Sequence, residues 1–584
     1  MNVVVSPSTW PSVRGKCHGR PCSLAGRLAA LLAICASVIG LSRAGGAGEP
    51  VLGWSAPATG LSLEPHDDLA GKTMVFEREG RWADLVSACE TAARKGKLAA
   101  ELQQRYEVAK IHCDLARRHA ETAYRAQLTK LTEADARRLY AEVLARIASH
   151  HVEAPNFARL VSRGMQAMDI AIDEPAFASL HVQTADPAAR VSYRQRIAQL
   201  AAGRSVGSQG EAETFAAWIA SIAHTTLGVP APVTLLEMSA AAMGSLDEYS
   251  SFLTTGQLDD LYAQIEGNFV GLGVELKAAA DGLLVVHVIP GSPAQRAGLR
   301  AGDHLVGVGG QALGGMGVDQ AAQLLQGPPG SLVTLAVLRA PSPARAVTVR
   351  REHVEVPSVE GGRMLDPAAG VAYLKLSSFQ KTTAADLEAA LRRLDVAGMR
   401  ALVLDLRGNP GGLLSAAVDV ADLFLERGLV VATRGRSAEE NFNYSASRPG
   451  TWKMPLVVVI DGDSASSSEI FAGAIRDHGR GTIVGTRSYG KGSIQGIFPL
   501  ETAGVGMRLT TAKFYSPEGH PYSGVGVEPH LIVHTAARPT GAVSLVGTAA
   551  GNAADPFLDT AVEAARRSLP RPASRPQPRS TVAR

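Results

Sequence analysis

The sequence has 584 residues, which is too many for one ordinary domain and predicts three or four domains. Hydrophobic residues make up 46% of the chain, enough for sizeable cores, and 60 glycines are typical of a loop-rich α/β protein. The formal net charge is only +3, so no overall charge attracts the chain to nucleic acid or to a membrane surface.

Residues 1–47 have the pattern of a targeting segment. Four Lys or Arg residues lie between positions 14 and 27, an apolar run spans Leu28–Leu41, and small residues follow at Ser42–Ala47. This order is typical of a secretory signal peptide, and the apolar run is short for a membrane span. We therefore expect a periplasmic or secreted protein. The alternative is an uncleaved segment that anchors the protein to the membrane.

Three of the five cysteines lie within this segment and would leave with it. Cys89 and Cys113 remain, and they either pair in an oxidising compartment or stay as buried free thiols. No Cys/His cluster has the spacing of metal ligands, so we expect no metal and no other cofactor. His150 and His151 are interpreted as a surface pair at a helix end.

Residues 70–235 are rich in Ala, Arg, Glu and Leu, and their apolar positions recur with helical spacing. The pattern predicts a helical N-terminal domain over residues 48–243. It contains no catalytic constellation, and its expected role is self-association or adaptor binding. The apolar series that shows the spacing most clearly is Leu102, Tyr106, Ala109 and Cys113.

Two stretches between residues 266 and 351 carry a specific signature. The first is Phe269-Val270-Gly271-Leu272-Gly273, and the second, Val285–Asp303, contains Ser-Pro-Ala, Ala-Gly-Leu and Gly-Asp in that order. Both resemble a PDZ domain. The resemblance implies that the first stretch binds a peptide C-terminus through its backbone N–H groups, while the peptide adds as a strand. A PDZ domain alone supports only peptide binding.

The stretch from Leu456 to Gln495 carries the candidate chemistry. Leu456–Ile460 predicts a buried strand, Asp463–Ser468 a tight junction, and Glu469 the first turn of a helix. A serine at such a junction can expose its hydroxyl beside N–H groups that stabilise an oxyanion. The serine needs a base, and a desolvated Lys491 between two glycines could act as one. From composition alone, a helix cap and a solvated lysine are the alternatives.

Two motifs in this stretch resemble those of the C-terminal processing peptidases, also called tail-specific proteases. They read Ser464-Ala-Ser466-Ser467-Ser468-Glu469-Ile470 and Tyr489-Gly-Lys491-Gly-Ser-Ile-Gln495. The resemblance implies that Ser466 is the nucleophile, Lys491 the general base 25 residues later, and Gln495 the residue that orients the lysine. Ser467 replaces a common alanine, and its N–H would serve in the oxyanion hole.

The resemblance extends over residues 244–529 and implies a protease core formed by residues 244–265 and 352–535. Within it, Ala401–Leu414 is predicted to be a buried strand, an Asn-Pro-Gly-Gly turn and a helix start. The family's second oxyanion donor falls on Gly411 or Gly412, and we prefer Gly411.

A rival motif overlaps the lysine. Gly485–Lys491 fits most of a phosphate-binding P-loop. Gly492, however, stands where the magnesium-binding Ser or Thr belongs, and Ser493–Leu500 predicts a strand where a P-loop requires a helix. The pattern therefore disfavours nucleotide binding.

Residues 536–584 form a C-terminal extension whose end, Ser568–Arg584, is rich in Pro and Arg and is expected to be disordered. Taken together, the sequence predicts a multidomain α+β protein with a helical N-terminal domain, a PDZ domain and an α/β protease core. The resemblance implies an ATP-independent serine endopeptidase that cleaves protein substrates at free C-terminal tails, with no nucleic-acid partner. The alternative is a catalytically silent PDZ scaffold, which the intact set of Ser466, Lys491 and Gln495 disfavours.

Overall fold

A computed structural model of the chain describes residues 3–4, 65–93, 96–279, 281–314, 324–325, 327–534 and 555–570. The predicted signal segment lies outside the described residues, apart from β1 (Val3–Val4). Residues 315–323 in the predicted PDZ domain and most of the C-terminal extension also lie outside them.

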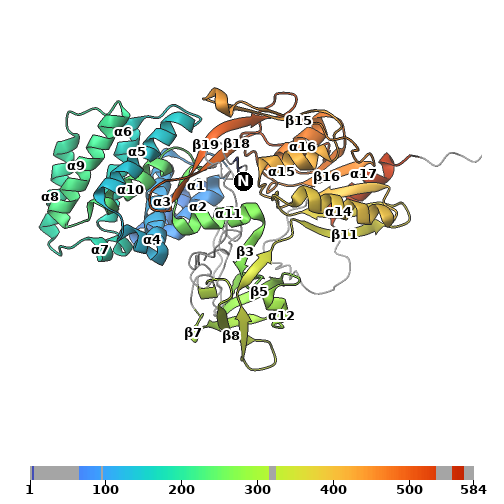
Figure 1. Cartoon of the computed structure of the whole chain (residues 1–584), viewed down its shortest axis with the longest axis horizontal. Helices are drawn as coiled ribbons and strands as arrows, with labels where there is room; N and C mark the ends of the chain where they lie inside the picture. The colour runs from blue at the N-terminus through green and yellow to red at the C-terminus, as the bar shows by residue number, and fades with distance from the viewer. Residues whose placement is uncertain are drawn as a thin grey trace, which may run out of the picture.

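The described part of residues 65–244 is helical, as the sequence predicts (Figure 1). A small core joins the first three helices, and a larger one is built by α5, α6, α9 and α10. No helix within the described ranges is both long and apolar enough to cross a membrane. The helices are α1 (Pro65–Arg78), α2 (Trp82–Ala93), α3 (Ala100–Ala120), α4 (Thr122–Leu128), α5 (Glu133–His150), α6 (Phe157–Ala171), α7 (Pro175–His181), α8 (Pro187–Ala201), α9 (Gln209–Leu227) and α10 (Ala231–Gly244).

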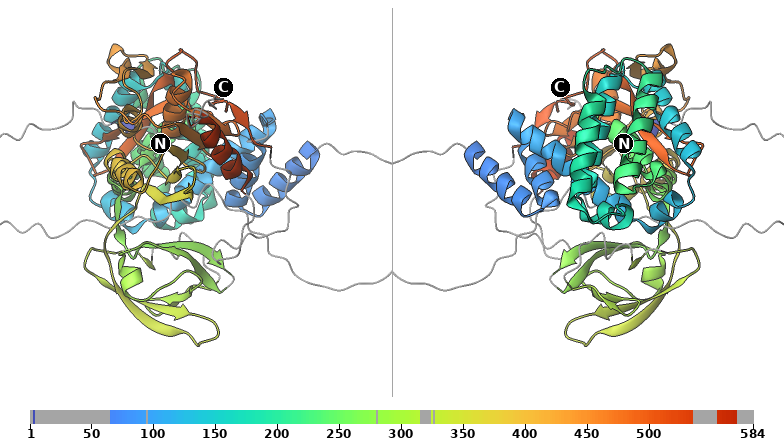
Figure 2. Two further views of the ribbon diagram at one scale, coloured as in Figure 1. Left: turned by 90° about the vertical axis from the view of Figure 1, so that its right-hand side faces the viewer. Right: turned by 90° about the vertical axis from the view of Figure 1, so that its left-hand side faces the viewer.

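The predicted PDZ region is an antiparallel sheet with its own apolar core, and it lies below the rest of the molecule in both views of Figure 2. Its strand order is β4-β5-β6-β8-β9, with β7 beside β6, so β4 is an edge strand. A two-stranded ribbon of β3 (Asn268–Gly271) and β10 (Glu352–Glu355) connects this sheet to the core. The PDZ elements are β4 (Val274–Ala279), β5 (Gly282–Val288), α12 (Pro293–Arg296), β6 (His304–Val308), β7 (Gln311–Ala312), β8 (Leu332–Leu338) and β9 (Arg345–Arg350).

The predicted protease core contains a sheet in the order β11-β12-β13-β16-β17-β20, parallel throughout except for β11. Its four inner strands, β12, β13, β16 and β17, are mainly apolar without alternation because both of their faces are buried. Helices α14, α15 and α16 cover one face, and α17 covers the other. The bounds are β11 (Val359–Asp366), β12 (Val371–Leu376), α14 (Thr383–Val396), β13 (Ala401–Asp405), α15 (Leu414–Asp422), β16 (Leu456–Ile460), α16 (Ser467–Asp477), β17 (Thr482–Gly485), β20 (Leu531–Ile532) and α17 (Pro556–Ser568).

A second sheet lies between the helical region and this core (Figure 1). Its central hairpin, β18–β19, contributes Phe498, Met507 and Leu509 to the large helical core, so the two regions share one apolar interior. Its elements are β1, β2 (Ser251–Leu253), β14 (Gly428–Gly435), β15 (Asn443–Ala446), β18 (Ser493–Pro499) and β19 (Gly506–Tyr515), with α11 (Thr255–Glu266) and the short helix η2 (Ala438–Glu440) nearby in the chain. The loops after β13, β16 and β17 emerge at one edge of the parallel sheet, where ligands of such sheets bind.

Candidate active site

Ser466 occupies the junction between β16 and α16, and its backbone there is unusual. Its φ and ψ are 61° and −113°, and its side chain is fully buried. Among the described residues other than glycine, only Ala503 also has a positive φ. Such strained backbone concentrates at functional positions, where the surrounding structure maintains it.

The four serines of the junction differ in what their hydroxyls do. Three of them donate to carbonyl groups of the loop that follows β13. The Oγ of Ser466 is buried and has no hydrogen-bond partner among the described residues. The geometry therefore separates one unengaged hydroxyl from three structural ones, whose bonds are Ser464 Oγ to Leu406 O (2.8 Å), Ser467 Oγ to Gly412 O (3.1 Å) and Ser468 Oγ to Asn409 O (3.0 Å).

Lys491 is buried, with 9% of its surface exposed, and its Nζ lies 4.7 Å from the ring centroid of Tyr249. Burial, together with the positive charge of Arg508, lowers the pKa of Lys491 to about 7, although nearby carboxylates oppose this shift. A large share of the lysine is therefore neutral at neutral pH and able to accept a proton. Ser466 and Lys491 are not hydrogen-bonded to each other, since the serine hydroxyl has no partner. Such bonds often form only when substrate is bound.

Glu469 joins the loop of the serine to the loop of the lysine. One of its carboxylate oxygens accepts the N–H groups of both Ser466 (2.7 Å) and Lys491 (2.9 Å). The other accepts the hydroxyl of Ser488 (2.6 Å) and the N–H of Gly490 (2.6 Å). Burial raises the pKa of Glu469, while these four bonds favour the ionised form. Sequence reasoning assigned Glu469 only to the start of a helix. The available signal was its position three residues after Ser466.

We expect Glu469→Gln to lower kcat about 10- to 100-fold, because an amide cannot accept all four bonds and leaves buried donors unpaired. Loss of the negative charge should also lower the pKa of Lys491 and move the acid limb of the rate profile to lower pH. Peptide hydrolysis measured against pH checks both effects. Asp477→Asn, at the far end of α16, is the matched control. An unshifted acid limb would contradict this account.

Gly411 packs directly against the serine junction. Its φ is 101°, and a Cβ there would lie 2.8 Å from Cβ of Ser466 and 2.9 Å from the backbone N of Ser467. The position therefore requires glycine, and the two proposed oxyanion donors lie side by side. The N–H of Gly411, however, donates to Oδ1 of Asn409 (2.9 Å). It would have to leave this partner, or share its proton, to bind an oxyanion.

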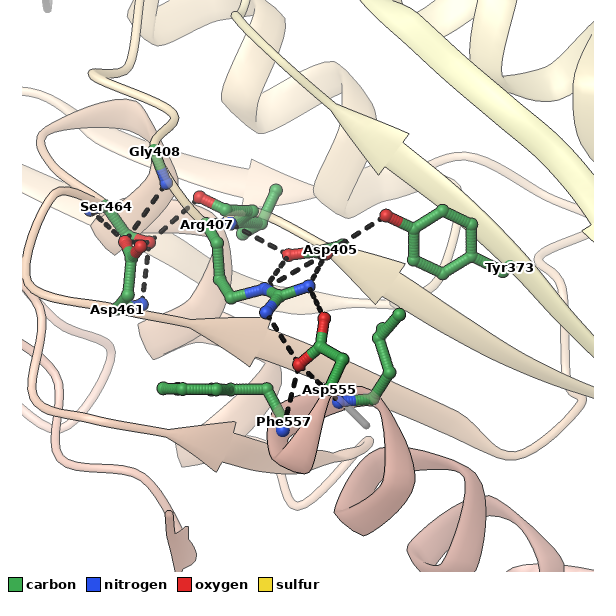
Figure 3. Close-up of polar contacts among 10 residues, drawn as sticks. Tyr373, Asp405, Arg407, Gly408, Asp461, Ser464, Asp555 and Phe557 are labelled. Carbon is green, nitrogen blue, oxygen red and sulfur yellow. Dashed lines mark hydrogen bonds and ion pairs between the residues drawn. The ribbon is translucent and has the colours of Figure 1, made fainter. Parts of the chain in front are cut away.

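A cluster of charged side chains fixes Arg407 and Gly408, at the start of the loop that carries Gly411 (Figure 3). Arg407 binds Asp405 (2.7 Å) and also Asp555 (3.0 Å), which caps α17. Oδ1 of Asp461 accepts the N–H groups of both Gly408 and Ser464, each at 3.0 Å. The loops after β13 and β16 are thus fixed to each other. The C-terminal helix supports them, and the sequence analysis predicted no helix there.

Gln495 lies in β18 and is fully buried. Its Nε2 donates to Ser493 Oγ (3.0 Å) and to Thr510 Oγ1 (3.4 Å). Its Oε1 is buried and has no hydrogen-bond partner within the described ranges. The structure does not join Gln495 to Lys491 by a hydrogen bond, but it leaves an unused acceptor on the glutamine.

The predicted carboxylate-binding stretch divides into two parts. Phe269, Val270 and Gly271 belong to the β3–β10 ribbon. Leu272 and Gly273 form the turn before β4, where their carbonyls accept N–H groups from the segment after β5. Leu272 and Gly273 are therefore the part of this stretch that adjoins the edge strand β4.

The structure also bears on the predictions for the cysteines, for His151, for the P-loop alternative and for metal ligands. Cys89 and Cys113 are free thiols, so they do not pair. The interpretation of His151 as a surface residue is wrong, because its ring is buried against the core and bonded to Asp247. β18 confirms the strand that argued against a P-loop. Among the residues that the structure places, no group of three or more His, Cys, Asp or Glu could hold a metal ion.

Two family models match the chain. The model described as peptidase family S41 matches residues 370–533, and a PDZ domain model matches residues 284–339. A carboxy-terminal-processing protease of Bartonella bacilliformis is 37% identical over 295 residues, which cover 50% of this chain and 67% of the relative.

A second relative and a solved structure are also similar to this chain. A probable CtpA-like serine protease of Staphylococcus aureus (strain COL) is 31% identical over 291 residues, 50% of this chain and 58% of the relative. Among solved structures, a photosystem II D1 C-terminal processing protease is 26% identical, with a TM-score of 0.37. That match covers 74% of this chain and 97% of the other.

Proposed function

Because this chain belongs to the carboxy-terminal-processing proteases of peptidase family S41, and is therefore a serine endopeptidase, we propose that it cleaves protein tails with a Ser466–Lys491 dyad and without ATP. One observation carries the assignment of the dyad. Ser466 has the unengaged hydroxyl of the junction, and the buried Lys491 shares with it the carboxylate of Glu469.

The proposed reaction begins when the neutral amine of Lys491 takes the proton of the Ser466 hydroxyl as its oxygen attacks the scissile carbonyl. Backbone N–H groups at Gly411 and Ser467 stabilise the negative oxygen of the tetrahedral intermediate. The lysine then gives its proton to the leaving amine, and the C–N bond breaks to leave an acyl-enzyme. Water, deprotonated by the same lysine, hydrolyses the ester and restores the serine.

The PDZ region supplies substrate selection in this proposal. A free C-terminus binds at the turn formed by Leu272 and Gly273, and the peptide lies along β4 as an added strand. We further propose that the protein works in the periplasm or outside the cell, and that the helical region serves self-association or adaptor binding. A silent PDZ scaffold would bind the same tails without cleaving them.

We expect a peptide with a free C-terminal carboxylate to bind Ser466→Ala protein about 10- to 100-fold more tightly than its C-terminal amide. The reason is that hydrogen bonds to a charged group contribute about 1.5–3 kcal/mol. Titration of both peptides by calorimetry measures the ratio. A bulky Gly271→Trp change in the adjoining strand should reduce the affinity for the free-carboxylate peptide. Equal binding of the acid and the amide would exclude capture of C-termini.

A further inference from the structure

His151 follows α5, where the helical region meets the protease core. Its side chain is buried, and its Nε2 lies 3.1 Å from Oδ2 of Asp247. Its Nδ1 lies 3.0 Å from the carbonyl oxygen of Glu153. The next residue, Val152, donates its N–H to the carbonyl of Thr510 in β19 (2.9 Å). The end of α5 is therefore docked on the hairpin that follows the lysine.

The carboxylate of Asp247 accepts hydrogen bonds from several donors. Besides His151, it accepts the N–H groups of Tyr249 (2.8 Å) and Ser250 (2.9 Å), the Ser250 hydroxyl (2.7 Å) and the Thr510 hydroxyl (3.0 Å). Burial raises the pKa of this carboxyl, but the hydrogen bonds outweigh it and lower the pKa of Asp247 to about 2. Asp247 is thus a fixed negative charge near Lys491, whose pKa it raises.

Thr510 contacts both Asp247 and Gln495 through its hydroxyl group. Its hydroxyl donates to Asp247, and the same oxygen lies 3.4 Å from Nε2 of Gln495. With its amide nitrogen held in this way, Gln495 keeps its other atom, Oε1, as a buried acceptor without a partner in the described chain. An unfilled buried acceptor is costly, and a lysine amine carries donors that could fill it. Gln495 follows Lys491 by four residues.

We propose that His151 is a positioning residue for the lysine base, acting from the helical region through Asp247 and Thr510 on Gln495. The proposal rests on the Ser466–Lys491 dyad of the proposed function. It gives the helical region a role in catalysis, because the docking of α5 sets the orientation of the base.

The charges around these groups determine in which direction the pKa of Lys491 should change in each variant. Lys491 is influenced by Arg508, Glu248, Glu469 and Asp247, while Arg436 donates to the backbone carbonyl of His151 (3.1 Å). A donor bound to Asp247 weakens the field of that carboxylate at the lysine. Removing such a donor should therefore raise the pKa of Lys491, whereas removing the charge itself should lower it.

The test compares kcat, KM and the acid midpoint of kcat/KM in full-length variants, using a peptide substrate. His151→Met and Thr510→Val should each lower kcat about 10-fold, with KM within about twofold, and raise the acid midpoint by about half a pH unit. Asp247→Asn should move the midpoint to lower pH. His151→Gln keeps a donor and should recover most of kcat. His150→Met and Thr511→Val are the neighbouring controls and should behave as wild type.

An unmoved midpoint in both His151→Met and Thr510→Val would overturn the proposal, even if stability fell, since a purely structural role predicts that result. The Thr510 variant tests the same link if the His151 variant does not fold. Failure of the dyad itself would look different: Ser466→Ala or Lys491→Met would then remain active, whatever the His151 variants do.

Discussion

Ser466→Ala should abolish peptide hydrolysis, with kcat falling by about 10⁴-fold or more, as expected when a catalytic nucleophile is removed. The fold should persist, because the lost hydroxyl makes no hydrogen bond in the described structure. Hydrolysis of an unfolded protein with an apolar C-terminus, followed without ATP and in the presence of a chelator, measures the effect. Circular dichroism checks the fold.

The neighbouring serines provide matched controls for this experiment. Ser464→Ala and Ser468→Ala each remove a hydroxyl that donates to a backbone carbonyl, so they should lower stability and keep most of the activity. If either of these variants is the inactive one, or if Ser466→Ala retains near wild-type turnover, the nucleophile is misassigned. Loss of wild-type activity in the chelator, restored by zinc, would argue against the dyad as a whole.

The core strands could be predicted from the sequence because both faces of the parallel sheet are buried. Leu456–Ile460 and Thr482–Gly485 are continuous apolar runs, and they form β16 and β17 with these bounds. The local structure around Ser466 and Lys491 could also be predicted, because the residues that form the tight junction, the helix start and the glycine turns lie within a few positions of each other in the sequence.

The partners of the site could not be predicted, because they come from distant parts of the chain. His151 precedes Asp247 by 96 residues, and Asp555 follows Arg407 by 148. A polar residue at a helix end is ordinarily solvated, so His151 looked like a surface residue. Its burial follows from the packing of the helical region on β18 and β19, which no local pattern encodes.

The same limit applies to the oxyanion donors. The Asn-Pro-Gly-Gly turn indicates a sharp bend, but not where each N–H points. The structure brings Gly411 against Ser466 and Ser467 while its N–H donates to Asn409. Whether a donor is free depends on this side-chain bond, which the spacing of the motif does not specify.

Lys491→Met should remove activity as completely as Ser466→Ala, because methionine fills a similar volume but cannot accept a proton. Lys491→Arg should be inactive as well, since arginine keeps the charge and stays protonated at all working pH values. In the wild type, kcat/KM should rise with pH through a midpoint near 7, the pH at which the buried lysine becomes neutral.

The Lys491→Met substitution should raise the stability of the protein although it removes the activity. In the Ser466→Ala background, where self-cleavage is prevented, the lysine is protonated in the unfolded chain up to its ordinary pKa of 10.5 but only below about 7 in the folded state. Below pH 7 the burial of the charged lysine therefore lowers the free energy of unfolding by its full amount. This loss of stability becomes smaller as the pH rises from 7 to 10.5. Lys491→Met should raise the free energy of unfolding by a few kcal/mol at pH 6, and by less at pH 9.

Denaturant unfolding of the two proteins at both pH values measures this difference. A gain that is equal at pH 6 and pH 9 would mean that the lysine is not desolvated in the folded protein. An active Lys491→Arg variant would mean that the lysine supplies charge and does not act as the base. Either result would remove the physical basis for assigning proton transfer to Lys491.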